Sequence, residues 1–190
     1  GMDGTPFLGE DISKAQMEAK DEVYGYGERF DELYAFNRTL RKGNFKYSRN
    51  FQPYHSKSLY SLYRYKQAAF REWKKMYNNG KLNKVQSYFF ESQGAEELYD
   101  LSLDPYETKN LAGDPTYQSK LKELRALLKK QMVDKHDLGL YPECVWLEQG
   151  KTNPTQFGLT NSNSIKRYSD IADLEMETFN KAKNALTKAL

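Results

Sequence analysis

Residues 97–111 read ELYDLSLDPYETKNL, and this stretch decides how the chain is organised. Leu98 and Leu101 anchor a short predicted strand, and Asp104-Pro105 predicts a turn directly after it. A helix is expected to begin at Asp114-Pro115, where an N-cap residue precedes proline at the first helical position. The stretch therefore predicts a strand that leads over the edge of a sheet into a helix.

The flanking segments predict a β-hairpin before this stretch and amphipathic helices around it. Lys42-Gly43 separates two runs with a period of two, which is typical of hairpin strands. Arg38 is the polar exception on one face of the first run, and a last helix is expected from about Ser169. In the hairpin, the residues expected on one face of each strand are Tyr34, Phe36 and Leu40, and then Phe45, Tyr47, Arg49 and Phe51. In the helix after Asp114, the residues expected on the apolar face are Tyr117, Leu121, Leu124, Leu128 and Met132. In the last helix they are Ile171, Leu174, Ala182, Leu186 and Ala189.

These elements predict an α+β fold, a small antiparallel sheet packed by helices with a terminal helical extension. A chain of 190 residues suits one compact domain with an appendage. Its 15 Tyr and 10 Phe compensate for a modest share of aliphatic residues, because each buried ring removes a large area from water. We therefore expect a core rich in aromatic rings.

Charge and composition exclude several classes of function. The formal net charge of +3 is too small to indicate nucleic-acid binding, so no nucleic-acid partner is expected. The single cysteine, Cys144, excludes an internal disulfide framework, and His55 and His136 are too far apart for a local metal motif. No apolar run approaches the length of a membrane span, and no membrane partner is expected.

The stretch at 97–111 resembles a phrase from the C-terminal region of the type I sulfatases. In that family a Glu-Leu-Tyr-Asp-Leu strand leads into Asp-Pro, then Glu, then Asn-Leu, and a helix follows. Residues 38–50 are similar to the family's hairpin, and residues 3–8 are similar to the stretch that introduces its C-terminal part. The insert around Trp73 resembles sulfatases of the heparan N-sulfatase type, and the resemblance covers about residues 3–140.

The resemblance implies a division of the chain into four parts. Residues 1–21 are a connector from an N-terminal catalytic domain that this sequence lacks, and residues 22–135 are the sulfatase C-terminal α+β subdomain. Residues 136–165 are expected to be irregular. Residues 166–190 form either a single terminal helix or the start of a helical-repeat extension. Because the last residues lie in a helical pattern without a stop signal, we expect a fragment of a longer protein.

The resemblance also implies chemistry that this sequence does not carry. Type I sulfatases use a formylglycine, made from the first residue of Cys/Ser-x-Pro-x-Arg, together with a calcium ion in the N-terminal domain. Cys144 is followed by Val145 and Trp146, so it is not a formylglycine precursor. We expect no catalytic residue, metal site or cofactor in this chain, only in its parent, which the family places in the periplasm, outside the cell or in the lysosome.

What the resemblance implies for this chain is a contribution to the rim of the substrate pocket. The main candidates are Glu28, Arg29, Asp31 and Glu32, directly before the hairpin. Carboxylates hydrogen-bond sugar hydroxyls or an amine, and Arg29 is suited to pair with a uronate or sulfate. The alternative is a solvated charged loop or a salt bridge between subdomains.

His55 is the second candidate, because a protonated imidazole can donate to an anionic ligand. Lys57, Arg64 and Lys66 are candidates to extend a basic rim, and Trp146 is a candidate to stack on a sugar. Exposed loop residues without a ligand are the alternative in each case.

Two functions remain open from the sequence. The first is a C-terminal fragment of a sulfatase, a sulfuric ester or sulfamate hydrolase acting on sulfated glycans, in which the chain supplies scaffold and substrate rim. Its partners are its own catalytic domain and the sulfated carbohydrate. The second is a stand-alone, non-catalytic carbohydrate-binding or protein-interaction module. Only the first predicts an exposed apolar face that another domain covers.

Overall fold

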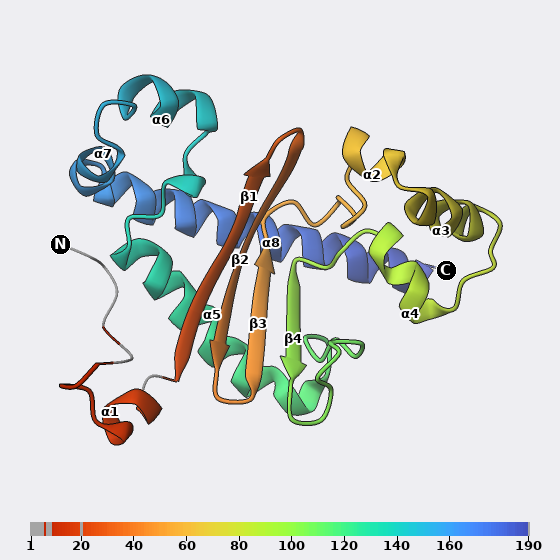
Figure 1. The fold of residues 1–190 in the computed structure, drawn as a ribbon, viewed down its shortest axis with the longest axis horizontal. Helices are drawn as coiled ribbons and strands as arrows, with labels where there is room; N and C mark the ends of the chain where they lie inside the picture. Colours follow the sequence, from red (N-terminus) through yellow and green to blue (C-terminus); the bar gives the residue numbers. More distant parts are fainter. Residues whose placement is uncertain (1–5, 7–8, 20, 190) are drawn as a thin grey trace.

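The computed structural model describes residues 6, 9–19 and 21–189, with side chains up to residue 182. It has the predicted α+β architecture, a four-stranded antiparallel sheet in the order β1-β2-β3-β4 with helices on one face (Figure 1). The strands are β1 (Glu22–Phe30), β2 (Leu33–Lys42), β3 (Phe45–Asn50) and β4 (Glu96–Asp100), and the helices on the sheet are α5 (Gln118–Asp134) and α8 (Ser162–Ala189). The other helices are α1 (Lys14–Glu18), α2 (Leu62–Lys66), α3 (Ala68–Asn78), α4 (Lys84–Ser87), α6 (Glu143–Gln149) and α7 (Pro154–Thr160).

The predicted hairpin is formed by β2 and β3. Leu40 lies opposite Tyr47, and Tyr47 lies opposite Leu98 of β4, so these three side chains share one face of the sheet. Gly43 turns the chain between the strands with a φ of 57°, a conformation that favours glycine. A further strand, β1, extends the hairpin on its other side and leaves β4 at the opposite edge.

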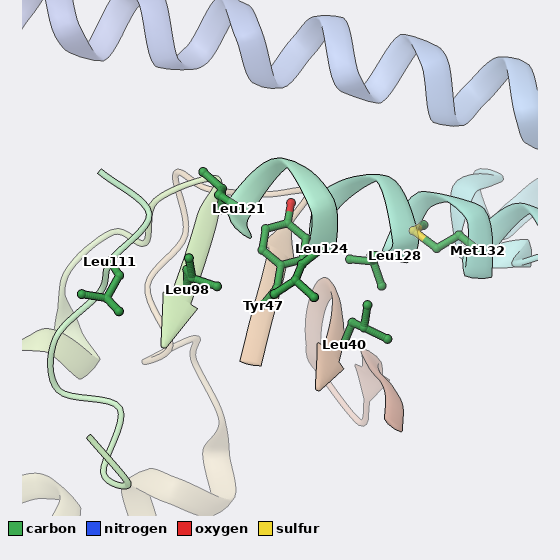
Figure 2. Packing of buried hydrophobic residues seen from close by; sticks show 8 residues of the cluster. All are labelled: Leu40, Tyr47, Leu98, Leu111, Leu121, Leu124, Leu128 and Met132. Carbon is green, nitrogen blue, oxygen red and sulfur yellow. The ribbon is translucent and has the colours of Figure 1, made fainter. Parts of the chain in front are cut away.

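The core lies between this face of the sheet and α5. Leu121, Leu124, Leu128 and Met132, the inner positions predicted for the helix, are all buried there with Leu40, Tyr47, Leu98 and Leu111 (Figure 2). Burying a leucine side chain stabilises a fold by about 1.5–3 kcal/mol, so this stripe is a main source of stability.

The stretch at 97–111 protects the exposed edge of β4. The side chain of Asn110 accepts a hydrogen bond from the Leu98 amide at 3.0 Å and donates one to the Glu96 carbonyl at 3.2 Å. The Leu111 amide donates to the Leu98 carbonyl at 2.8 Å. Edge strands expose unpaired backbone groups, and here the connection to α5 satisfies them.

The terminal helix was predicted with the wrong face. Ile171 and Leu174 are 50% and 63% exposed, whereas Ile165 and Met176 are buried. Ser169 is also buried, and the Ala172 carbonyl accepts a hydrogen bond from Arg49 at 2.7 Å, which links α8 to β3. Ala182 is exposed, and the side chains of Leu186 and Ala189 lie outside the described residues.

The two ends of the molecule carry separate groups of helices (Figure 1). Residues 136–165, expected to be irregular, contain α6, α7 and the first turn of α8. At the other end, Trp73 and Phe70 of α3 pack on Phe90 with ring centroids 4.7 and 6.1 Å apart. Over the described part of the chain, no helix has the length and apolarity needed to cross a membrane.

Candidate functional site

A pocket of about 290 Å³ lies beside the end of β2, between the sheet and the loop that leads to α2; we call it the His55 pocket. None of its described lining residues is Asp or Glu, and two of them, Lys57 and Arg64, are cationic. The remaining polar lining comes from Asn37, Asn50, Gln52, His55, Ser56 and Gln93, and the apolar lining from Leu33, Ala35, Phe36, Leu59 and Phe89.

Arg64 holds the wall of the His55 pocket in place. Its Nη1 donates to the carbonyls of Lys57 and Leu59, both at 3.1 Å, and its guanidinium lies 5.4 Å from the centre of the Phe89 ring. The opposite wall is fixed by Asn50, whose Nδ2 donates to the Gly94 carbonyl at 2.8 Å. Hydrogen bonds to backbone carbonyls of neighbouring segments therefore hold these side chains at the edge of the pocket.

Two groups of this pocket are suited to receive a ligand. Lys57 is 40% exposed, and its Nζ lies 3.6 Å from Oε1 of the buried Glu97, which accepts a hydrogen bond from the hydroxyl of Tyr88. Burial is the main cause that raises the pKa of Tyr88, so its hydroxyl stays a donor to Glu97. Oε1 of Gln52 is buried without a hydrogen-bond partner, which leaves an acceptor for a ligand hydroxyl.

A second pocket, of about 510 Å³, lies between the end of β1 and α6; we call it the Arg29 pocket. Arg29 makes a bidentate contact with Glu143 of α6, with Nε 2.7 Å from Oε1 and Nη2 2.5 Å from Oε2. The hydrogen bonds from Arg29 lower the pKa of Glu143, so the pair is ionised at neutral pH. The other lining residues are Tyr26, Gly27, Glu28, Phe30, Tyr34 and Trp146.

A buried ionic network supports the Arg29 pocket from below. Arg38, the polar exception of the sequence pattern, is 2% exposed and contacts Asp137 through Nε at 2.5 Å and Nη2 at 2.7 Å. Glu28 also contacts Arg38, and the hydroxyl of Tyr24 donates to Asp137 at 2.6 Å. Burial opposes the charged form of Asp137, but the hydrogen bonds and charge of Arg38 outweigh it and lower the pKa. The network therefore ties the segment before α6 to the sheet.

The structure separates the residues predicted for the substrate rim. Glu28 and Arg29 line the Arg29 pocket, and His55 lines the other pocket. Asp31 and Glu32 form the turn between β1 and β2 and line neither, and Glu32 accepts a hydrogen bond from the Leu62 amide at 2.7 Å. Residues that sequence reasoning missed are Asn50, Tyr26 and Glu143, since no local motif marks them.

Comparison with known proteins identifies the origin of this fold. The chain is 35% identical over 143 residues to an ulvan-active sulfatase from Formosa agariphila, which covers 75% of the chain and 23% of the relative. It is 55% identical over 42 residues to a Δ4,5-hexuronate-2-O-sulfatase from Bacteroides thetaiotaomicron, covering 22% of the chain and 8% of the relative. The chain is homologous to sulfatases. The resemblance that began with residues 97–111 is confirmed.

This sulfatase-related chain spans less than a quarter of the length of these curated relatives. No family profile matches it. A crystal structure of a candidate sulfatase from Bacteroides thetaiotaomicron aligns with a TM-score of 0.37 at 24% identity, covering 63% of the chain and 17% of that structure. A 2-O GAG sulfatase aligns with a TM-score of 0.38 at 22% identity, covering 69% of the chain and 22% of that structure.

The described residues do not fit the cofactors that the sulfatase relationship implies. Cys144 is exposed on α6, where Trp146 stands at the position that a formylglycine motif gives to proline. Within residues 6, 9–19 and 21–189, no group of three or more His, Cys, Asp and Glu side chains is placed to hold a metal ion. We therefore derive no catalytic step from residues of this chain.

Proposed function

We propose that the protein containing this chain hydrolyses sulfate esters or sulfamates on sulfated glycans, and that the chain supplies scaffold and part of the substrate rim. The observation that carries this proposal is the lining of the His55 pocket, whose described residues include two cations and no carboxylate, in a chain homologous to sulfatases. Formylglycine and a calcium ion are expected in the part of the protein outside this chain. That catalytic domain is also its expected partner.

The His55 pocket has groups for each part of an anionic sugar. Lys57 and His55 are suited to contact a sulfate or carboxylate, because charge-assisted hydrogen bonds to anions are stronger than neutral ones. The unpaired Oε1 of Gln52 is suited to a sugar hydroxyl, and Leu33 and Leu59 offer apolar surface to the sugar ring. One relative is named for a sulfated hexuronate, a sugar that carries both kinds of anion.

Exposed aromatic residues favour the fragment over a stand-alone module. Away from the Arg29 pocket, Tyr54, Tyr60 and Tyr63 are 61%, 63% and 73% exposed. Contiguous exposed apolar groups commonly mark interaction sites, and the fragment hypothesis predicts such a surface. This supports a role inside a larger protein.

The test uses the complete protein and a panel of sulfated oligosaccharides, with released sulfate measured by ion chromatography. We expect the substitution Lys57→Ala to raise KM about tenfold with little change in kcat, because the lost contact to a charged group is worth roughly 1.5–3 kcal/mol. Lys66→Ala, an exposed cation outside the pocket lining, is the matched control. A complete protein that binds these glycans but releases no sulfate would support the binding-module alternative instead.

A further inference from the structure

The Arg29 pocket has a chemistry opposite to that of the His55 pocket. Among its described lining residues are two carboxylates, of Glu28 and Glu143, and one cation, Arg29. That cation is already engaged on both sides by Glu143, so it has little charge left to offer an anion. A sulfate placed here would face carboxylates without a free cation, which disfavours an anionic ligand.

Aromatic rings surround this charged pair. Tyr26 and Phe30 are largely exposed, and Tyr34 and Trp146 also line the pocket. The guanidinium of Arg29 lies 5.3 Å from the centre of the Tyr34 ring. Exposed rings next to planar, hydrogen-bonding side chains present both an apolar surface and fixed polar groups, as small-molecule sites do.

We propose that the Arg29 pocket is a second carbohydrate site, which binds an uncharged sugar residue. One face of the sugar ring packs on the aromatic side chains, with Tyr26 and Trp146 as the main contacts. Hydroxyl groups of the sugar donate to the carboxylates of Glu28 and Glu143 and accept from Arg29. The inference rests on the proposed function in taking the ligand to be a glycan, and it extends recognition from a sulfated residue to an unsulfated one.

A contribution to folding stability does not explain the Arg29–Glu143 ion pair or the exposed ring of Tyr26. Arg29 and Glu143 are 49% and 31% exposed, and exposed ion pairs contribute little to folding. Tyr26 covers the buried Arg38, whose guanidinium lies 5.8 Å from the ring centre, yet most of its surface faces solvent. A site for a ligand accounts for the exposure and for the arrangement together.

Tryptophan fluorescence and calorimetry test the proposal directly. The complete protein is titrated with uncharged tetrasaccharides of glucose, galactose, xylose and N-acetylglucosamine, and separately with sulfated tetrasaccharides. We expect at least one uncharged sugar to change the fluorescence saturably, with the change absent in Trp146→Phe and the affinity reduced about tenfold in Tyr26→Ala. Tyr106→Ala, which removes an exposed tyrosine elsewhere, is the matched control and should bind normally.

The outcomes separate this inference from the proposed function. If no uncharged sugar binds while sulfated sugars bind in a manner that depends on Lys57, the second site is wrong and the proposed function stands. If sulfated sugars also fail to bind, both are wrong. A melting temperature of the complete protein that falls in Tyr26→Ala, without any loss of sugar binding, would show that the aromatic surface packs against another part of the protein and would overturn the proposal.

Discussion

The His55 pocket and the Arg29 pocket lie at the same end of the sheet but differ in charge. Strand β2 contributes to both: Leu33, Ala35, Phe36 and Asn37 line the first pocket, and Tyr34 lines the second. The first pocket combines cations with amide side chains, and the second combines carboxylates with exposed rings. Although the overall charge of the chain is nearly balanced, the two pockets differ in charge and are suited to different sugar residues.

The two pockets also differ in how they are held. Hydrogen bonds from Arg64 to backbone carbonyls fix the His55 pocket, and all its segments lie between residues 33 and 93. The Arg29 pocket depends on α6, and the buried contacts of Arg38 with Asp137 tie the segment before α6 to the sheet. Arg38 also contacts the ring of Phe36 and the carbonyl of Asn37 in the His55 pocket, so damage to this network should affect the Arg29 pocket more than the His55 pocket.

The largest expected effect is that of Arg38→Ala. Removing the buried cation leaves Asp137 and Glu28 without their partner, and breaking a buried ion pair on one side costs about 3–5 kcal/mol of unfolding free energy. Urea denaturation measures this loss. Binding of uncharged sugars should weaken more than binding of sulfated ones, because the network holds Glu28 and the segment before α6, whereas among the described residues Arg38 contacts the His55 pocket through Phe36 and the Asn37 carbonyl alone.

Arg41→Ala serves as the control for this variant, since Arg41 is exposed on the same strand. The unfolding free energy of Arg41→Ala should stay within about 0.5 kcal/mol of that of the unsubstituted chain. Equal losses in the two variants, or equal weakening of both kinds of sugar, would contradict the assigned role of Arg38.

A smaller effect is expected from pH, again on the Arg29 side. The pKa of Asp137 in the folded chain lies below its usual 3.8, so the unfolded state binds this proton at higher pH. The stability that Asp137 contributes is therefore fully present above that value and is lost as the pH falls through the lowered pKa. Asp137→Asn should cost about 1.5–3 kcal/mol at pH 7.

The measurement is urea denaturation of the unsubstituted chain and of the Asp137→Asn variant between pH 7 and pH 2. The difference in unfolding free energy between them should shrink once the pH is below the usual pKa of the carboxyl group. Asp134→Asn, at an exposed position near the end of α5, is the comparison variant. If this difference in unfolding free energy stays constant with pH, the ionised form of Asp137 does not stabilise the folded chain.

Local patterns made much of the fold predictable. The strand, turn and helix of residues 97–117 and the apolar stripe of α5 depend on neighbouring residues and on helical spacing, and both were confirmed. The face of α8 was not predictable, because contacts distant in the sequence select it, among them the hydrogen bond from Arg49 of β3 to the Ala172 carbonyl.

The site was less predictable because its contacts are distant in the sequence. Arg29 and Glu143 are 114 positions apart, and only the fold brings them together. The charged group at 28–32 looked like one site, yet a β-bulge between Gly27 and Arg29 and the turn after Phe30 distribute its members over different surroundings. His55 could be selected for its chemistry, whereas nothing in the local sequence marks the amide of Asn50 as part of a pocket.

The smallest expected effect tests the charge of the His55 pocket, through Glu97→Gln. Glu97 is buried behind the pocket with its Oε1 3.6 Å from Nζ of Lys57, so it offsets part of the positive charge offered to a ligand. Glutamine keeps an acceptor for the hydroxyl of Tyr88 and removes the negative charge. Because Lys57 is 40% exposed and screened by solvent, we expect only about a threefold gain in affinity for sulfated tetrasaccharides, measured by calorimetry at low salt.

Glu91→Gln, at an exposed position nearby in the sequence, should leave this affinity unchanged. An unchanged or weaker affinity in Glu97→Gln would mean that Lys57 is not the partner of the sulfate, whereas a gain that vanishes at high salt and is absent for uncharged sugars would establish the electrostatic difference between the two pockets.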